Sequence, residues 1–202
     1  SQAGLILDAF PNDFNCQSEA DGVEGECNYA AIVPDDFSPT LVTSDNDGVF
    51  YLLDGDNQLL HRWSSEQEQY LDSIPVAFHA LTEDASVTDM AYVSGHDQVY
   101  LGYDSGAVVA LSTELNESFL PFAQLDYLVT SLADAGNYLI ASARYYGSQN
   151  IVLDSVGNSS NYQFNWSVSD DSVWSEADSI LYYLYGNYYL IAQELDANGA
   201  PV

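Results

Sequence analysis

The chain has 202 residues, of which 47% are hydrophobic and 13% aromatic, so it holds enough apolar material for a folded domain and is not a disordered segment. It carries 31 acidic residues against two basic ones, Arg62 and Arg144, and its formal net charge at pH 7 is −29. Such a surface repels nucleic-acid phosphates and anionic lipid head groups, which excludes a nucleic acid as a partner.

Residues 1–37 form an irregular, acidic lead-in. Cys16 and Cys27 lie in it, eleven positions apart, without further residues at zinc-ligand spacing. We expect them to form a disulfide that closes a short loop, with two free cysteines as the alternative. A disulfide indicates an oxidising compartment, so the expected location is secreted, periplasmic or at the cell surface.

From residue 38 onward, short β-rich apolar runs alternate with clusters of Gly, Asp and Asn. This pattern predicts antiparallel strands joined by tight turns. The polar stretch 64–79 is interpreted as an elaborated connection. No apolar run reaches the roughly 18 residues that a membrane span needs, so we expect none. The expected strands are 40–43, 49–53 and 59–63; 87–93, 98–103, 107–111 and 119–122; 128–133, 138–145, 150–154 and 162–168; and 172–174, 180–185 and 188–195.

The strand pattern repeats along the chain. One turn glycine marks each unit: Gly48, Gly106, Gly147 and Gly186. The intervals are 58, 41 and 39 residues, and the first is attributed to the insert after residue 63. Each complete unit is expected to close on an aromatic residue, which is Trp63, Phe122 or Trp166. A period near 40 with about four short strands per unit is typical of a β-propeller blade.

Residues 47–63, Asp-Gly-Val-Phe-Tyr-Leu-Leu-Asp-Gly-Asp-Asn-Gln-Leu-Leu-His-Arg-Trp, resemble the repeat of PQQ-like, or quinoprotein-type, β-propellers. In that repeat a glycine precedes an apolar strand ending in Leu-Asp, followed by a polar turn, two apolar residues and a tryptophan. Parts of 103–111 and 147–166 match it again, although the usual Thr-Gly of the turn is absent and Phe122 replaces one tryptophan. The resemblance covers 38–202 and implies an all-β propeller of four-stranded blades, but little about chemistry.

Two forms of the propeller are open. Four units would make a small ring, with residues 5–7 or 30–33 supplying the missing outermost strand. Alternatively, the chain is part of a larger propeller of six to eight blades, and further domains of the same chain would be its partners. We favour the larger form, because propellers of this type usually exceed four blades and open β edges need covering.

The densest acidic cluster contains Asp45, Asp47, Asp54 and Asp56. Asp45-Asn46-Asp47-Gly48 resembles the start of a calcium loop, and calcium is the one cofactor considered. The twelfth position of that loop is Asp56 rather than Glu, however, and apolar residues fill the positions between. Hairpin turns are therefore the preferred interpretation. The general acidity is attributed to solubility in a salty medium.

Five tyrosines fall within eight positions, Tyr182, Tyr183, Tyr185, Tyr188 and Tyr189. Packing between blades is the favoured interpretation, and an aromatic platform that binds a sugar or a peptide is the functional alternative. The sequence shows no Ser–His–Asp order with a nucleophile elbow and no Gly-rich phosphate loop.

Regular repeats without a convergent catalytic set predict a secreted or cell-surface β-propeller binding module for a protein, peptide or glycan, without catalysis of its own. The alternative is a propeller enzyme, either a quinone-dependent dehydrogenase or an enzyme acting on polysaccharides. A third hypothesis, which the family resemblance implies, is a periplasmic scaffold of outer-membrane assembly.

Overall fold

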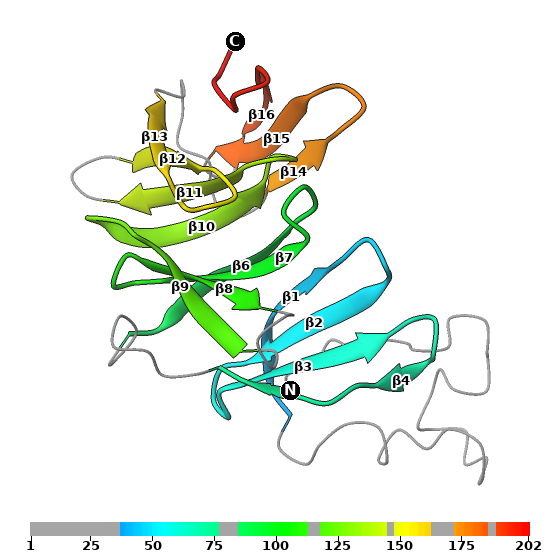
Figure 1. Cartoon of the computed structure of the whole chain (residues 1–202). Helices are drawn as coiled ribbons and strands as arrows, with labels where there is room; N and C mark the ends of the chain where they lie inside the picture. Colours follow the sequence, from blue (N-terminus) through cyan, green and yellow to red (C-terminus); the bar gives the residue numbers. More distant parts are fainter. Residues whose placement is uncertain (1–36, 77–84, 113–117, 145–147, 163–171, 186–188) are drawn as a thin grey trace, which may run out of the picture.

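The computed structural model describes residues 37–76, 85–112, 118–144, 148–162, 172–185 and 189–202. Every regular element in these segments is a β-strand, and the strands form four antiparallel sheets that follow one another along the chain (Figure 1). The all-β prediction is therefore confirmed. The expected Cys16–Cys27 disulfide lies outside the described residues. Within the described segments no helix is long and apolar enough to cross a membrane.

Sheets 1 and 2 together contain nine strands. In each sheet the neighbouring strands follow one another along the chain, except that β5 pairs with β3 beside β4. The strands of sheet 1 are β1 (Pro39–Ser44), β2 (Val49–Asp54), β3 (Leu59–Ser64), β4 (Gln69–Tyr70) and β5 (Ile74–Pro75). The strands of sheet 2 are β6 (Val87–Val93), β7 (Gln98–Tyr103), β8 (Ala107–Ser112) and β9 (Ser118–Gln124).

Sheets 3 and 4 continue the same up-and-down order. The strands of sheet 3 are β10 (Leu128–Asp134), β11 (Leu139–Arg144), β12 (Ser148–Leu153) and β13 (Ser159–Tyr162). The strands of sheet 4 are β14 (Ser172–Ser175), β15 (Ile180–Tyr185) and β16 (Tyr189–Glu194). Most of the strand predicted at 162–168 lies outside the described residues.

The polar stretch 64–79 is not simply a connection between strands, so this prediction is wrong in part. Its residues 69–70 and 74–75 form β4 and β5, and both pair with β3. The fourth strand of sheet 1 is thus split into two short pieces. Ile74, which is 2% exposed, anchors the second piece in the core. A two-residue strand carries too little alternation of apolar and polar residues to be recognised in the sequence.

The first strand of each of sheets 1 to 3 contains a β-bulge at a threonine. The threonines are Thr40, Thr88 and Thr130, and in each case the register shifts between the two flanking residues. Their hydroxyls donate hydrogen bonds to backbone carbonyls of the second strand, at 3.3, 3.1 and 3.2 Å. A bulge bends its strand and increases the local twist. The first strands of sheets 1, 2 and 3 are therefore expected to bend at the same place. The threonines therefore mark equivalent positions of the repeat.

The turn glycines do not mark equivalent positions. Gly48, with φ 79°, lies between β1 and β2, whereas Gly106, with φ 83°, lies between β7 and β8. The positional counterpart of Gly48 is Gly95, between β6 and β7. The 58-residue interval between Gly48 and Gly106 is therefore measured between two different turns of the repeat. Its length cannot be attributed to the insert alone.

The predicted closing aromatics are not equivalent either. Trp63 lies in β3, the third strand of its sheet, where its ring is 5.9 Å from that of Phe50. Phe122 lies in β9, the fourth strand, where its ring is 4.7 Å from that of Tyr100. Trp166 is outside the described residues. The two described aromatic residues lie on different strands of their sheets, so they do not mark one equivalent position of the repeat.

The sheets pack through their first strands. β1 contacts β6, β6 contacts β10, and β10 contacts β14, so sheets 1 to 4 are stacked in chain order (Figure 1). Each junction holds an apolar core, which lies between sheets 1 and 2, between sheets 2 and 3, and between sheets 3 and 4. Sheets 1 and 4 lie at opposite ends of this stack.

Polar contacts along the first strands fix the junction of sheets 2 and 3. The Leu132 amide donates to Asp89 Oδ2 at 2.6 Å, and the Gly95 amide donates to the Gly136 carbonyl at 3.0 Å. Asp89 directly follows the bulge threonine of β6. The bulge thus places a carboxylate where it accepts a backbone hydrogen bond from the next sheet, which fixes the alignment of the two sheets.

The close approach of sheets 2 and 3 can be tested at Gly102. A Cβ at this residue would lie 2.6 Å from Val129 Cγ1, so Gly102→Ala must force the sheets apart. We expect the free energy of unfolding to fall by about 1–3 kcal/mol in urea denaturation. Gly55→Ala is the control, because its Cβ would lie 3.6 Å from Thr40 Oγ1, at ordinary contact distance. We expect that variant to change stability by less than about 0.5 kcal/mol, and equal losses would contradict this explanation.

Candidate interaction surface

Each of sheets 1 to 3 turns one face toward the sheet that follows it, and a row of side chains across its first three strands fills that face. In sheet 2 the row is Ala91, Tyr100 and Ala110, which are direct partners across the strands and belong to the core shared with sheet 3. The first member of each row lies three positions after the bulge threonine. The corresponding rows are Thr43, Tyr51 and Arg62 in sheet 1 and Ala133, Ile140 and Val152 in sheet 3.

The central member of each row is a large side chain that the next sheet covers. Tyr51, Tyr100 and Ile140 are 9%, 0% and 0% exposed. Burial raises the pKa of Tyr51 and Tyr100, and the charge of Asp45 adds to the effect at Tyr51. With these raised pKa values the phenols stay neutral in the physiological range.

Sheet 4 carries the same row without a following sheet among the described residues. Its members are Val173, Tyr182 and Ala192, which are paired across β14, β15 and β16. Val173 is 66% exposed, Tyr182 is half-buried and Ala192 is exposed. Next to this row, Leu184 and its direct partner Leu190 are 39% and 69% exposed. The opposite face of the sheet, with Leu181 and Tyr183, is buried in the core shared with sheet 3.

We call this outward face the sheet-4 surface. It lies at the end of the stack of sheets (Figure 1). Because side chains alternate between the faces of a strand, its members follow from the register of the three strands. Its apolar members are Val173, Ile180, Tyr182, Leu184, Leu190 and Ala192. Ser175 and Glu194 lie on the same face beside Ile180, so the face is apolar except at this edge.

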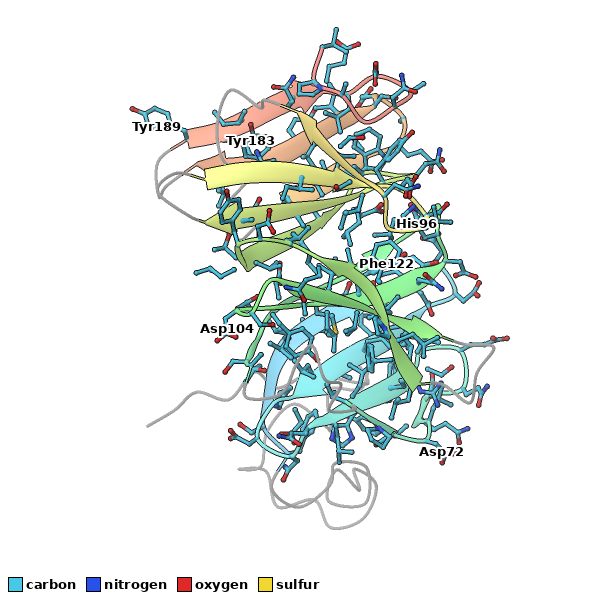
Figure 2. The ribbon with its side chains drawn as sticks, turned by 60° about the vertical axis from the view of Figure 1, so that its left-hand side comes forward. Asp72, His96, Asp104, Phe122, Tyr183 and Tyr189 are labelled. Carbon is cyan, nitrogen blue, oxygen red and sulfur yellow. The ribbon has the colours of Figure 1, made fainter. Side chains whose placement is uncertain are left out.

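The structure divides the predicted tyrosine cluster between two faces. Tyr183 is 1% exposed and faces sheet 3, with its hydroxyl buried and without a hydrogen-bond partner. Tyr189 is 62% exposed and projects from its strand (Figure 2). Tyr182 lies on the sheet-4 surface. The side chain of Tyr185 and all of Tyr188 are outside what the structure describes. The described tyrosines therefore do not form one flat aromatic platform.

Three aspartates close turns in the same way. Asp45, Asp154 and Asp196 each precede a positive-φ glycine by three positions. In each turn one carboxylate oxygen accepts hydrogen bonds from the backbone amides two and four residues later. Hydrogen bonds lower the pKa of Asp154, with the Asn158 side chain as the largest cause, and that of Asp196, with the Ala200 amide as the largest. Some of the aspartates that make the chain acidic therefore stabilise turns.

The four candidate calcium ligands are not brought together. Asp45 and Asp47 lie before β2, whereas Asp54 and Asp56 lie at its other end, separated by a six-residue strand. Asp45 Oδ2 also accepts a hydrogen bond from the Tyr51 hydroxyl at 3.0 Å. Among the residues that the structure describes, no group of three or more His, Cys, Asp or Glu side chains is placed to hold a metal ion.

Ser73, His61 and Asp54 meet in sheet 1 and have the residue types of a hydrolytic triad. Ser73 Oγ lies 2.8 Å from His61 Nδ1. His61 Nε2 is 3.9 Å from Asp54 Oδ2, beyond hydrogen-bond distance, and has no partner. Asp54 instead accepts hydrogen bonds from Asn57 and from the Ser38 amide. His61 and Asp54 are buried and Ser73 is exposed, and the imidazole lacks the hydrogen bond to the carboxylate that would orient it in a triad.

Burial sets the charge state of this cluster. Burial lowers the pKa of His61 although the neighbouring Asp54 raises it. Burial raises the pKa of Asp54, but hydrogen bonds from Asn57 and Ser38 and the nearby His61 outweigh it, so the net shift is downward. At neutral pH a neutral imidazole therefore lies beside a carboxylate.

Known proteins match this chain in fold only. No protein-family model matches the sequence, and a search of curated proteins gives no relative. The hydrazine synthase of Kuenenia stuttgartiensis superposes with a TM-score of 0.59 at 11% identity, over 88% of this chain and 51% of that chain. A luciferin-regenerating enzyme superposes with a TM-score of 0.54 at 12% identity, over 82% and 57%. The computationally designed protein Ika4 superposes with a TM-score of 0.54 at 14% identity, over 82% and 96%.

These neighbours are propeller-like folds. At 11–14% identity the likeness shows the fold alone. The chain spans about half the length of the hydrazine synthase and luciferin-regenerating chains, but nearly the whole of Ika4. A unit of this size therefore occurs both as part of a larger fold and as a separate protein.

The role of the acidic cluster can be tested with calcium. We expect the same melting midpoint in EDTA and in millimolar Ca²⁺ at matched ionic strength, because an ion raises the midpoint only if it binds the folded state preferentially. Mg²⁺ is the control for general charge screening. A rise with Ca²⁺ alone that Asp45→Asn removes would restore the calcium hypothesis.

The buried histidine predicts a loss of stability in mild acid. A lowered folded pKa means that the unfolded chain binds the proton more readily. The contribution of His61 is therefore complete above about pH 6.5 and is lost as the pH falls from there through the folded pKa. We expect the free energy of unfolding to fall more steeply between pH 7.5 and about 5 in the wild type than in His61→Leu. Parallel pH profiles would contradict a buried neutral imidazole.

Proposed function

We propose that this chain is an interaction module of the β-propeller type, built from PQQ-like repeats and secreted or displayed at a cell surface. It binds a protein partner through the sheet-4 surface and has no chemistry of its own. One observation carries the proposal: sheet 4 exposes aliphatic side chains, beside the half-buried Tyr182, at positions whose counterparts in sheets 2 and 3 are buried.

The propeller assignment is supported by the connectivity. Sheets 2 and 3 are four-stranded meanders, and the first strands of successive sheets lie side by side. This is the arrangement of propeller blades, which stack around a common centre through their first strands. The propeller-like solved neighbours agree with it.

The composition of the surface favours a protein over a glycan. Sugar rings stack on aromatic platforms, whereas Val173, Leu184 and Leu190 are aliphatic and Tyr183 is turned inward. The buried centres of protein interfaces are apolar and depleted of charge, and the exposed row of sheet 4 has this character. The secreted location rests on the expected disulfide and on the acidic composition.

A neutral apolar dye tests whether the surface is available for binding. We expect Nile red to fluoresce with the dilute wild type, and we expect Val173→Glu and Leu190→Glu to reduce the emission several-fold. Val156→Glu is the matched control, because Val156 is 72% exposed in the β12–β13 turn, away from the sheet-4 surface. If all three variants bound the dye as the wild type does, or lost it equally, the proposed surface would be wrong.

A further inference from the structure

We propose that the protein partner contributes an extended, basic strand, which pairs antiparallel with the open edge of β16 and lays its apolar residues beside the sheet-4 surface. This inference rests on the proposed function and names the chemistry of the partner. The site is an edge of backbone groups, so it adds to the side-chain surface of the same sheet.

A fourth strand covers the third strand in sheets 2 and 3. β9 pairs with Ala107–Ser112 of β8, and β13 pairs with Asn150–Leu153 of β12. β16 is the third strand of sheet 4, and among the described strands it pairs with β15 alone. Residues 107–111 of β8 are at most 8% exposed, whereas Leu190 of β16 is 69% exposed. β16 therefore presents an open edge.

The turn after β16 is of the kind that leads into a fourth strand in sheet 3. In the turn Asp154–Asn158, the Asp154 amide donates to the Asn158 carbonyl at 3.1 Å, and the Gly157 amide donates to the Asp154 carbonyl at 3.0 Å. The turn Asp196–Ala200 makes the same two hydrogen bonds, at 2.8 and 2.9 Å. The chain therefore leaves β16 in the way that it leaves β12 toward β13.

The two residues after this turn run back along β16. Pro201 forms an antiparallel bridge with Leu195, and the Val202 amide donates to the Glu194 carbonyl at 3.0 Å. A fourth strand thus begins here, and it fixes the register in which further residues would pair with β16. Residues 189–193 have no described strand on this side. The edge is therefore open where it adjoins the sheet-4 surface.

The register identifies the backbone groups that face the open edge. The Leu195 amide donates to the Ser179 carbonyl at 3.0 Å, on the side of β15. Because successive residues of an antiparallel strand direct their backbone groups to opposite sides, Leu190 and Ala192 point their N–H and C=O groups away from β15. The Glu194 carbonyl, which accepts a hydrogen bond on the outer side, follows the same alternation. Such edge groups are a template for an additional strand.

The same register places the side chains of the added strand. Residues opposite Leu190 and Ala192 lie on the face of the sheet-4 surface, because directly paired residues share one face of a sheet. Apolar side chains at these places would contact the exposed Leu190 and extend the apolar face. The residues between them lie on the other face. The fitting strand is therefore apolar at every second position.

Charge makes a basic strand the favoured occupant. β14, β15 and β16 contain no Lys, Arg or His, and the two arginines of the chain lie in sheets 1 and 3. Glu194 ends β16, Asp196 begins the turn that follows, and the whole chain carries −29. An acidic strand, or a second copy of this chain, is repelled, whereas a basic strand is attracted from a distance. Binding should therefore weaken as salt rises.

Peptide binding tests the edge on the full chain. The probe is a labelled, end-blocked peptide of alternating lysine and valine, about as long as β16, and we expect its binding to weaken between about 0.05 M and about 0.5 M NaCl. N-methylation of the valines removes the N–H groups that face β16 and should weaken binding at least about 10-fold, whereas N-methylation of the lysines should not. Equal binding of the two methylated peptides would overturn the proposal, since charge alone would then hold the peptide.

A proline tests the same contact from the protein side. Ala192→Pro removes an edge N–H group without breaking a hydrogen bond to β15, and edge strands tolerate proline in this orientation. We expect peptide binding at least several-fold weaker, with unchanged circular dichroism. Ala192→Val is the matched control, because it keeps the N–H group and should bind at least as tightly as the wild type. If Ala192→Pro did not fold, the methylated peptides would still decide.

Two further outcomes would contradict the basic partner. A peptide of alternating glutamate and valine that bound as tightly as the lysine peptide would remove the argument from charge. A wild-type dimer in light scattering that Ala192→Pro abolished would replace the basic strand by a second copy, paired through the same edge.

Failure of this inference can be told from failure of the proposed function. If no peptide bound while Val173→Glu still lowered the Nile red emission, the strand partner would be wrong and the sheet-4 surface would stand. If the peptide bound at the edge while Val173→Glu left the dye emission unchanged, the edge would be the site and the proposed surface would be wrong.

Discussion

The structure depends on one constraint: the apolar faces of neighbouring β-sheets must be buried against each other. The cores between sheets 1 and 2, 2 and 3, and 3 and 4 satisfy it inside the chain. The outward face of sheet 4 is not covered in this way, since Val173 and Leu190 are more than half exposed, whereas Leu52 and His61 on the outward face of sheet 1 are buried. Burying apolar area is the main favourable term of folding, and the proposed interaction surface is therefore the exposed face of sheet 4.

The sequence predicted the positions of the strands better than it predicted which positions are equivalent between repeats. Alternation of apolar runs with Gly, Asp and Asn clusters located most strands, because tight turns need these residues at fixed places. The glycines failed as repeat markers because a positive φ is needed in several turns of a sheet, so Gly48 and Gly106 fill different ones. A threonine followed two positions later by an apolar residue was the better signal, as at Thr40, Thr88 and Thr130. This threonine marks a β-bulge, and the bulge can be recognised only from the strand pairing.

The candidate site could be located in part. The tyrosine-rich segment 182–189 drew attention to sheet 4, which does carry the exposed surface. Its aliphatic members were missed, because Val173, Leu184 and Leu190 resemble core residues in a sequence, and exposure depends on whether a neighbouring sheet exists. The acidic cluster allowed two interpretations for a related reason. An Asp three positions before a glycine suits a calcium loop and a carboxylate-closed turn alike, and only the hydrogen bonds separate the two.

The linear order of the sheets also bears on how the molecule loses its structure. In the part of the chain that the structure describes, the main contacts of each sheet are with its neighbours in the stack, so stability is expected to be roughly the sum of unit and junction terms. Among the described residues, sheets 1 and 4 each have one junction with a neighbouring sheet, and sheet 4 has three strands. Fraying should therefore begin there, while sheets 2 and 3 open last. Closing the array into a circle would leave no end at which fraying can start, and would make unfolding of the whole array cooperative.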